Sequence, residues 1–164
     1  MKIYTSYFYQ IRNFPRNLIP LSTAVWDPKW YHDYRNASHV YIDKRGIFVG
    51  FRAEMFVPDD SCNGLCLGPD RPDICCQNGG KYGCSFLNTY RAQLDELDFN
   101  EVLSEMQDFT EKISTLLKSG AREHNVALIF HEAPDNPCSE RRVVQDWFKD
   151  HDYPIEEFNH EIHS

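Results

Sequence analysis

The chain has 164 residues and a formal net charge of −8, with 25 acidic against 17 basic side chains. Hydrophobic residues make up 41% and charged residues 26%, which indicates a globular protein rather than a disordered one. The acidic balance disfavours strong binding to duplex nucleic acid, and the length suits one domain with its own core. We therefore expect a single domain over residues 1–164.

The first residues, Met1 to Ser6, have neither the apolar run nor the small-residue cleavage site of a signal peptide. No segment is long and apolar enough to span a bilayer, so no membrane association is expected. The default prediction is a cytoplasmic protein, in which thiols stay reduced.

Strands are predicted near the amino terminus. Residues 3–8 (IYTSYF) and 18–25 (LIPLSTAV) are rich in β-branched and aromatic side chains. Pro20 has no N–H to give to a ladder, so the second strand is expected to begin near Leu21. The short apolar run at 47–51 suits either an edge strand or a buried loop.

Helical periodicity follows residue 84. Apolar side chains recur at three- and four-residue steps from Phe99 to Leu117, behind a capping box that begins at Asp98. A weaker pattern over 87–97 indicates an earlier helix. The apolar face over 143–148 predicts a final helix with Ser139 as its N-cap.

Residues 126–130 (VALIF) form a continuous apolar run, which is typical of a central strand covered on both faces in a parallel sheet. Residues 155–158 are expected to add a last strand. Together these elements predict an α/β fold, a mostly parallel sheet flanked by helices in a Rossmann-like arrangement.

An irregular insertion is predicted at 58–84, where glycine, proline, aspartate and cysteine crowd together. A loop with so few apolar residues needs a cross-link, and four thiolates are preferred structural ligands of zinc. Its candidate metal ligands are Cys62, Cys66, Cys75, Cys76 and Cys84. The first two suit one ligand pair, and Cys84 with either Cys75 or Cys76 suits the other. Disulfides, an iron–sulfur cluster and unpaired thiols remain alternatives, although a reducing compartment disfavours disulfides.

The strongest candidate for chemistry is the segment that follows the central strand. In an open parallel sheet ligands bind beyond the carboxyl ends of the strands, which is where Glu132 falls. Cys138, Ser139 and Arg141 then stand at the start of the next helix, where N–H groups and the helix dipole favour an anion and lower the pKa of a thiol. Glu132 is expected to act as acid or base, Cys138 as nucleophile or polar wall, and Arg141 as a ligand for a phosphate or carboxylate.

The other parallel strands should end on the same rim. Aromatic side chains there can stack on a base or sugar, and Lys29 can meet a phosphate. The candidate ligand-binding residues are Ser6, Tyr7, Trp26, Lys29, Trp30, Tyr31 and Ser139.

Structural roles are an alternative for each of these residues. The aromatic rings can simply close one end of the core, and Ser139 can act only as a cap. Cys138 can be a small buried apolar group, and Glu132 can pair with Arg141 or Arg142. The joint placement of these residues, rather than any single one, favours a functional site.

These stretches resemble the bacterial and viral domain of unknown function 488 family. The resemblance rests on IYTSYF at 3–8, PKWY at 28–31 and the segment 126–147, where the family shows a Tyr-Glu-Lys-Pro type loop and then Cys-His-Arg. This chain has HEAP at 131–134 and CSER at 138–141, so the histidine is missing and the arginine is displaced by one position. The resemblance implies the fold and the location of the site without implying a reaction, and it leaves the cysteine loop as an insertion.

Two functions remain open. One is an enzyme or ligand-binding domain for a small anionic substrate, such as a nucleotide or nucleoside, at the carboxyl ends of the strands. The other is a zinc-stabilised, non-enzymatic module that binds a protein or nucleic-acid partner. The acidic charge favours a protein over a nucleic acid as that partner.

Overall fold

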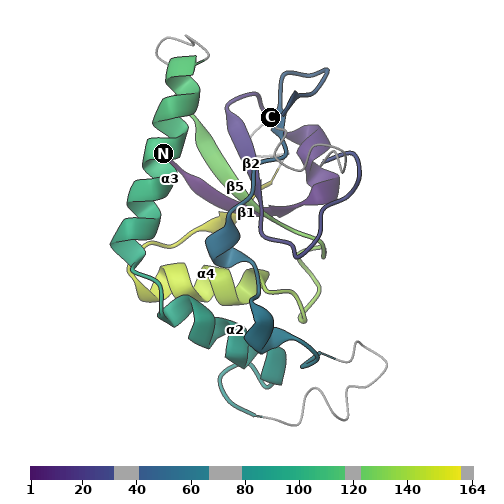
Figure 1. Ribbon diagram of the computed structural model, residues 1–164, viewed down its shortest axis with the longest axis vertical. Helices are drawn as coiled ribbons and strands as arrows, with labels where there is room; N and C mark the ends of the chain where they lie inside the picture. Colours follow the sequence, from purple (N-terminus) through teal and green to yellow (C-terminus); the bar gives the residue numbers. More distant parts are fainter. Residues whose placement is uncertain (32–40, 67–78, 117–122, 160–164) are drawn as a thin grey trace.

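A four-stranded sheet forms the centre of the computed structural model, which describes residues 1–31, 41–66, 79–116 and 123–159. The strands lie in the order β2-β5-β1-β6, and every pairing between them is parallel (Figure 1). Their bounds are β1 Ile3–Tyr7, β2 Leu18–Ser22, β5 Asn125–Phe130 and β6 Glu156–Glu157. The expected α/β fold with a mostly parallel sheet is confirmed at this level.

The apolar strand β5 lies between β2 and β1. Val126 is opposite both Ile3 and Ile19, and Phe130 is opposite Tyr7 at the far end. Residues 126–130 are all buried, as expected for a strand that is covered on both faces. Pro20 lies inside β2, so the expectation that this strand begins near Leu21 is wrong. An edge strand tolerates proline because the missing N–H can face away from the neighbouring strand.

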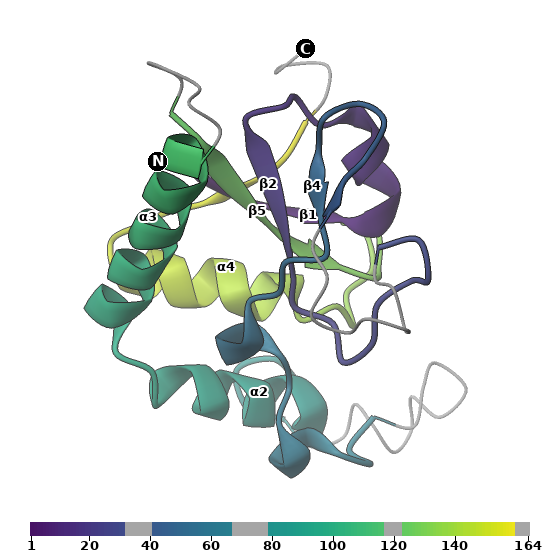
Figure 2. The ribbon, with the colours of Figure 1, turned by 45° about the horizontal axis from the view of Figure 1, so that its top comes forward.

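One face of the sheet carries the α-helices (Figure 2). These are α2 Ser85–Asp95, α3 Phe99–Leu116 and α4 Arg141–Asp150. The predicted start of α3 is confirmed, because Oδ1 of Asp98 accepts a hydrogen bond from the N–H of Glu101 (3.1 Å). Trp147 of α4 is completely buried and its ring contacts those of Phe56, Phe99 and Phe148.

The opposite face carries shorter elements. The 3-10 helix η1 (Phe8–Asn13) packs there with the buried ring of Tyr31. The antiparallel pair β3 (Tyr41–Ile42) and β4 (Phe48–Val49) lies beside them. The α-helices therefore flank one face, and a 3-10 helix with a small β-ribbon covers the other.

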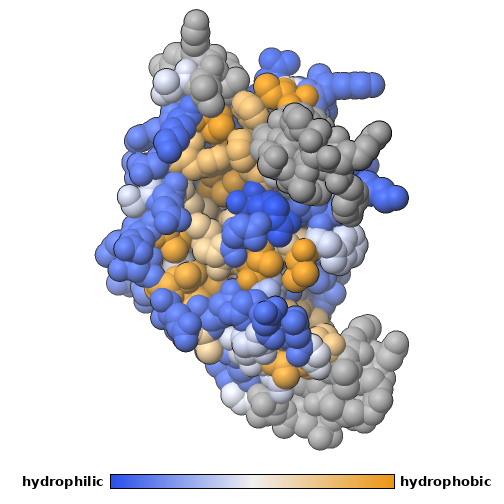
Figure 3. Space-filling view, viewed as in Figure 1, coloured by the Kyte–Doolittle hydropathy of each residue, from blue (hydrophilic) through white to orange (hydrophobic). Residues whose placement is uncertain are grey.

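The segment after β4 crosses from the ribbon to the helical face. It contains the 3-10 helices η2 (Glu54–Phe56) and η3 (Asp60–Cys62). Figure 3 shows hydrophobic side chains gathered between α3 and the middle of the molecule. The contact between Phe51 and Phe109 of α3, whose ring centroids are 4.7 Å apart, joins this segment to that helix.

Part of the predicted cysteine-rich insertion is described. Asn88 of α2 holds residues 79–82, because its side chain donates to the carbonyl oxygen of Gly79 (2.8 Å) and accepts from the N–H of Tyr82 (3.1 Å). Cys75 and Cys76 lie outside the described residues. Among the helices that are described, none combines the length and apolar character that crossing a membrane requires.

Candidate ligand-binding site at the carboxyl ends of the strands

The neighbouring strands β1 and β5 send the chain to opposite faces of the sheet. After Tyr7 the chain enters η1 on one face, and after Phe130 it runs into α4 on the other. The two strands end side by side, because Tyr7 is the register partner of Phe130. A parallel sheet opens a crevice at such a switch point, which is the usual place for a ligand.

Arg141, the first residue of α4, holds this switch point together. Its Nη2 donates to the carbonyl oxygens of Ser6 (3.2 Å) and Glu132 (2.8 Å), which belong to the ends of the two strands. Its Nε lies 2.7 Å from Oε1 of Glu157. The residue is only 3% exposed, so the guanidinium is a buried cation that needs this carboxylate.

Glu157 brings β6 into the same site. Its Oε1 also accepts from the hydroxyl of Thr5 (2.8 Å), which in turn accepts from Nε2 of Gln145 (2.7 Å). Burial raises the pKa of the Glu157 carboxyl, and the charge of Arg141 opposes that shift. The polar network therefore joins β1, β6 and α4 beneath the crevice.

Four buried polar atoms at this network have no hydrogen-bond partner of good geometry among the described residues. They are Oε2 of Glu157, Nη1 of Arg141, Oγ of Ser6 and Nε of Arg141, whose short contact with Oε1 of Glu157 counts as an ion pair only. Buried polar groups are nearly always satisfied by protein, water or a ligand. Their concentration at the ends of β1 and β6 distinguishes this region from the rest of the sheet.

A cavity of about 520 Å³ opens beside this network. It lies between η1, the loop after β5 and the end of β6. Its lining residues are Tyr7, Gln10, Asn13, Pro134, Glu157, Phe158 and Asn159. The volume is in the range of small-molecule sites, and several polar side chains converge on it.

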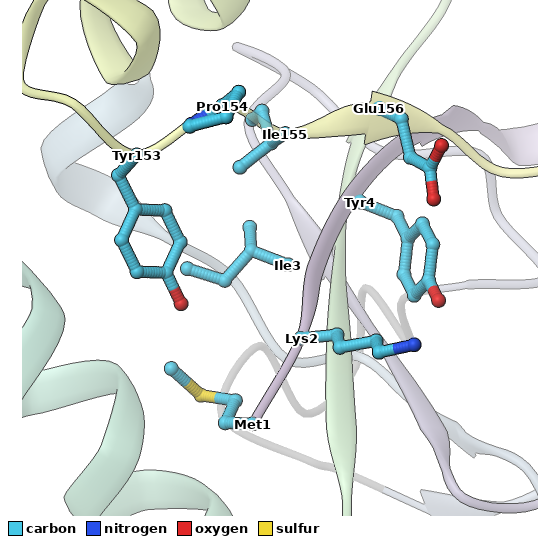
Figure 4. A pocket seen from close by; sticks show the side chains of 8 residues that line it. All are labelled: Met1, Lys2, Ile3, Tyr4, Tyr153, Pro154, Ile155 and Glu156. Atoms are coloured by element: carbon cyan, nitrogen blue, oxygen red, sulfur yellow. The ribbon is translucent and has the colours of Figure 1, made fainter.

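Cavities also exist at the opposite end of the sheet, with volumes of about 430 and 300 Å³. Figure 4 shows the larger of these two, where β1 separates two sets of side chains. Met1, Ile3 and Tyr153 lie on one side of the strand, and Lys2 and Tyr4 lie on the other (Figure 4). The polar ends of Lys2, Tyr4 and Glu156 lie on the same side of that strand (Figure 4), so both ends of the sheet carry polar groups. The cavity of about 520 Å³ is the better candidate because it lies at the carboxyl ends of parallel strands.

Two carboxylates lie close together at the start of α4. The hydroxyl of Ser139 donates to Oε2 of Glu132 (3.2 Å) and accepts from the N–H of Arg141 (3.2 Å). Burial, and then the nearby charge of Glu132, raise the pKa of Glu140 from 4.5 to about 7. A carboxyl group with a pKa near neutrality can take or give a proton under ordinary conditions.

The structure brings together some of the residues expected at this site. Glu132, Ser139 and Arg141 contact one another directly. Cys138 is exposed, and its N–H donates to the side chain of Asn136 (2.9 Å). The first helical residue of α4 is Arg141 with Glu140 at the N-cap, so the expectation that Ser139 is the N-cap is wrong by one position.

The predicted aromatic residues divide into two groups. Trp26 is 63% exposed and Trp30 is 50% exposed, whereas Tyr31 is completely buried. The hydroxyl of Tyr31 donates towards the carbonyl oxygens of Pro20 and Phe51, so this residue belongs to the core.

The exposed indole of Trp26 lies against the ring of His131, with a centroid separation of 4.3 Å. Nε2 of His131 is also 2.8 Å from the carbonyl oxygen of Trp26. Lys29 is exposed on the same loop. This places one exposed aromatic pair beyond the ends of β2 and β5.

A buried ion pair fixes the loop that carries these aromatic residues. Nη1 of Arg52 lies 2.7 Å from Oδ2 of Asp27, and the hydroxyl of Ser22 donates to the other carboxylate oxygen. Arg52 also donates to the carbonyl oxygen of Ala24. The loop after β2 is thereby tied to the segment that follows β4.

The described cysteines are thiols rather than disulfides. Cys62 is buried, which raises the pKa of its thiol, Cys66 is exposed and Cys84 is half-buried. Among the described residues, no three histidine, cysteine, aspartate or glutamate side chains form a group that could hold a metal ion. These three cysteines alone do not compose a metal site.

Sequence reasoning missed Glu140 and Glu157. Glu140 stands between two residues that were singled out, Ser139 and Arg141, and the neighbours that bury it include elements distant in the sequence, those of Cys62 and Tyr90. Glu157 was placed only within a predicted last strand. Its pairing with Arg141 depends on β6 lying beside β1, which no local pattern reveals.

No family model, no curated protein and no solved structure matches this chain.

Proposed function

We propose that this protein binds, and acts on, a small ligand of the nucleotide or nucleoside class at the switch point between β1 and β5. The observation that carries the proposal is the ion pair of Arg141 and Glu157 beside a polar cavity, with four buried polar atoms that lack a hydrogen-bond partner among the described residues. The position of the cavity at the carboxyl ends of parallel strands supports the same conclusion.

The roles of the expected residues follow from their contacts. Glu132 and Glu140 form the acid–base pair, because burial and then the nearby charge of Glu132 raise the pKa of Glu140 to about 7. Arg141 positions the strand ends rather than binding the ligand's charge, since Glu157 already neutralises it. Cys138 is a nucleophile or a polar wall residue at the exposed edge.

A ligand screen with a cavity-filling variant tests this proposal. Thermal unfolding is measured with ribonucleosides and their 5′-phosphates. At a ligand concentration of about 100 times Kd, binding stabilises the folded state by about 2.7 kcal/mol. Asn13→Trp fills the cavity at the carboxyl ends and should abolish the shift. Asn17→Trp is the matched control, because Asn17 is equally half-buried but lines a cavity at the amino ends.

Turnover is tested with any compound that stabilises the protein. Glu132→Gln and Cys138→Ala should retain binding and lose conversion of the compound, followed by mass spectrometry. A screen in which no compound raises the melting temperature would contradict the proposal. So would a ligand whose effect survives in Asn13→Trp and disappears in Asn17→Trp.

We further propose that the cysteine-rich insertion binds zinc and stabilises the fold. The described thiols of Cys62, Cys66 and Cys84 flank Cys75 and Cys76 in the sequence, and the site requires at least one of these two. Metal analysis of the purified protein should find about one zinc ion per chain. A chelator should lower the melting temperature, and metal-free protein of unchanged stability would contradict the proposal.

Membership of the domain of unknown function 488 family remains a prediction. Its support is the position of the residues that carry the resemblance: the ends of β1 and β5 and the start of α4 meet at the proposed site. A nucleotide-binding role does not follow from the resemblance itself.

A further inference from the structure

Charge is distributed unevenly along this chain. Residues 1–52 contain eight basic and three acidic side chains, whereas residues 53–164 contain nine basic and 22 acidic ones. The first segment therefore has a formal charge of +5 and the second of −13, which together give the −8 of the whole chain. Because such a separation creates local fields of opposite sign, an anion that the whole molecule repels can still bind at the basic part.

The basic segment covers the face of the sheet opposite the α-helices. Figure 2 shows η1 beside the ribbon of β3 and β4 on this face, and the loop after β2 packs into the same apolar cluster. The carboxylates there are already paired, Asp27 with Arg52 and Asp43 with Arg45. The exposed cations, which together define the basic face, are Arg12, Arg16, Lys29, Lys44 and Arg45.

Contacts between η1 and the turn that joins β3 to β4 hold three arginines of the basic face together. The guanidinium of Arg45 donates to the carbonyl oxygens of Ile11 (3.1 Å) and Arg12. Nε of Arg16 in turn donates to the carbonyl oxygen of Arg45 (3.2 Å). The guanidinium of Arg12 lies 3.8 Å from the centroid of the Tyr9 ring. A phosphate that binds across these arginines gains charge-assisted hydrogen bonds.

The same face carries exposed aromatic side chains. Tyr9, Trp26 and Trp30 are 59%, 63% and 50% exposed. Every strongly exposed large hydrophobic side chain among the described residues lies between positions 9 and 42. The ring of Phe8, at the start of η1, is 6.1 Å from that of Trp30 and 4.9 Å from that of His131. His131 also contacts Trp26, so the two tryptophans belong to one cluster beside η1.

Cations beside exposed aromatic rings suit a single strand of nucleic acid. Lysine and arginine neutralise its phosphates, and its unstacked bases lie on the rings. A duplex cannot use the rings in this way, because its bases are already stacked, and an acidic peptide uses only the cations. The six residues of η1 span about 12 Å between the aromatic cluster and the arginines, so one strand can reach both.

We propose that the basic face binds single-stranded nucleic acid, with bases stacked on the exposed aromatic rings and phosphates bound by the lysines and arginines. The inference goes beyond the proposed function, because none of these side chains lines the cavity at the carboxyl ends. RNA and DNA share the chemistry that this face recognises.

Fluorescence anisotropy of labelled oligonucleotides tests this proposal. The probes are RNA and DNA strands of the same sequence, about 12 nucleotides long, the matching DNA duplex, and poly-glutamate as an acidic peptide. A single strand should bind at least about tenfold tighter than the duplex or poly-glutamate. Three bound phosphates give a slope of about −2 for the logarithm of the binding constant against that of the salt concentration. A preference for RNA over DNA identifies a contact with the 2′-hydroxyl groups.

Paired charge reversals locate the phosphate contacts. Lys29→Glu combined with Lys44→Glu should weaken binding at least about tenfold and reduce the salt slope by about 1.4. Lys112→Glu combined with Lys149→Glu is the matched control, because these lysines are also exposed but belong to α3 and α4. At about 0.15 M salt, where charges beyond about 8 Å are screened, the control should change affinity less than about threefold.

Substitution of one exposed indole locates the stacking contacts. Trp26→Ala should weaken binding of the single strand at least about fivefold, because stacking of a base on an aromatic ring is lost. Trp26→Phe keeps a ring and should stay within about threefold of the wild type. The melting temperature of each variant shows that the fold is retained.

The proposal is overturned if neither RNA nor DNA single strands bind at low salt, or if the duplex or poly-glutamate binds as tightly as they do. It is also overturned if both lysine pairs weaken binding equally, or if Trp26→Ala has no effect. Failure of nucleosides to bind at the carboxyl ends would contradict the proposed function alone.

Discussion

At the scale of single residues, the candidate site depends on the buried guanidinium of Arg141, which is stable there only because it is paired with the carboxylate of Glu157. Arg141 joins the carbonyl oxygens of Ser6 and Glu132 to the carboxylate of Glu157. Arginine suits this position because its rigid fork of donors can serve several acceptors at once. The same contacts make the residue a determinant of stability as well as of site geometry.

Removing the guanidinium should therefore destabilise the protein strongly. Arg141→Met leaves the Glu157 carboxylate buried without its cation, which typically costs about 3–5 kcal/mol. Urea unfolding at constant pH measures the loss. The double variant Arg141→Met with Glu157→Gln should recover part of the stability, because the uncompensated charge is gone. A loss below about 1 kcal/mol in the single variant would contradict the assigned ion pair.

Glu140 should make the stability of the protein depend on pH. Its pKa is about 7 in the folded protein against an ordinary value of 4.5, so the folded state holds the proton more tightly than the unfolded chain. The resulting penalty is absent below about pH 4.5 and complete above about pH 7.

Glu140→Gln, which resembles the protonated side chain, should therefore be more stable than the wild type near pH 8. A gain of about 1–2 kcal/mol is expected, less than the full shift implies because Glu140 is partly exposed. Most of this gain should disappear near pH 5. Chemical unfolding of both proteins at the two pH values measures it, and a gain that does not change with pH would contradict the assignment.

At the scale of elements, α4 has two roles. Its first residue, Arg141, donates hydrogen bonds to the ends of β1 and β5, and its middle is packed into the core. Trp147 contacts the rings of Phe56, Phe99 and Phe148 across three elements. The position of Arg141 therefore depends on the packing of a tryptophan two turns further along the helix.

Trp147→Ala should cost about 3–5 kcal/mol, because it leaves a cavity in the core. Trp26→Ala is the matched control, since that indole is 63% exposed, and it should change stability by less than about 0.5 kcal/mol. Trp147→Phe should cost less than the alanine variant, because the buried indole N–H has no acceptor among the described residues. Thermal unfolding followed by circular dichroism compares the three variants.

Elements with strong local patterns could be predicted from the sequence. The unbroken apolar run of β5 identified a strand inside the sheet, and Asp98 marked the start of α3. The two-residue strands β3 and β4 carry too little pattern to be distinguished from loops. Pro20 was misjudged because local reasoning does not reveal that β2 lies at the sheet edge.

The candidate site could be predicted in part for the same reason. Three of its residues follow the central strand directly: Glu132, Ser139 and Arg141. The geometry of a parallel sheet therefore brings them to the carboxyl ends of the strands. Glu157 comes from a short strand, and its register partner Thr5 is 152 residues away in the sequence, which only the folded chain reveals. The anion-binding role expected of Arg141 stays a prediction, and the structure adds that its guanidinium is paired with Glu157.

At the scale of the whole molecule, the two faces of the sheet are covered unequally and the polar network lies where they meet. The α-helices cover one face, and η1 with the β-ribbon covers the other (Figure 2). The crevice at the switch point is thus bounded by elements of both faces: η1 on one side and the loop leading to α4 on the other. The net charge of −8 opposes the approach of anions to the molecule as a whole.

The most direct test of this account is an amide NMR titration of the whole protein with ribonucleosides. The largest shifts should fall at the carboxyl ends of the strands, at Tyr7, Gln10, Asn13 and Asn159, while Lys2 and Tyr153 at the amino ends stay unchanged. Shifts that gather around Lys2 and Tyr153 instead, or the absence of any shift at saturating concentrations, would contradict the placement of the ligand site.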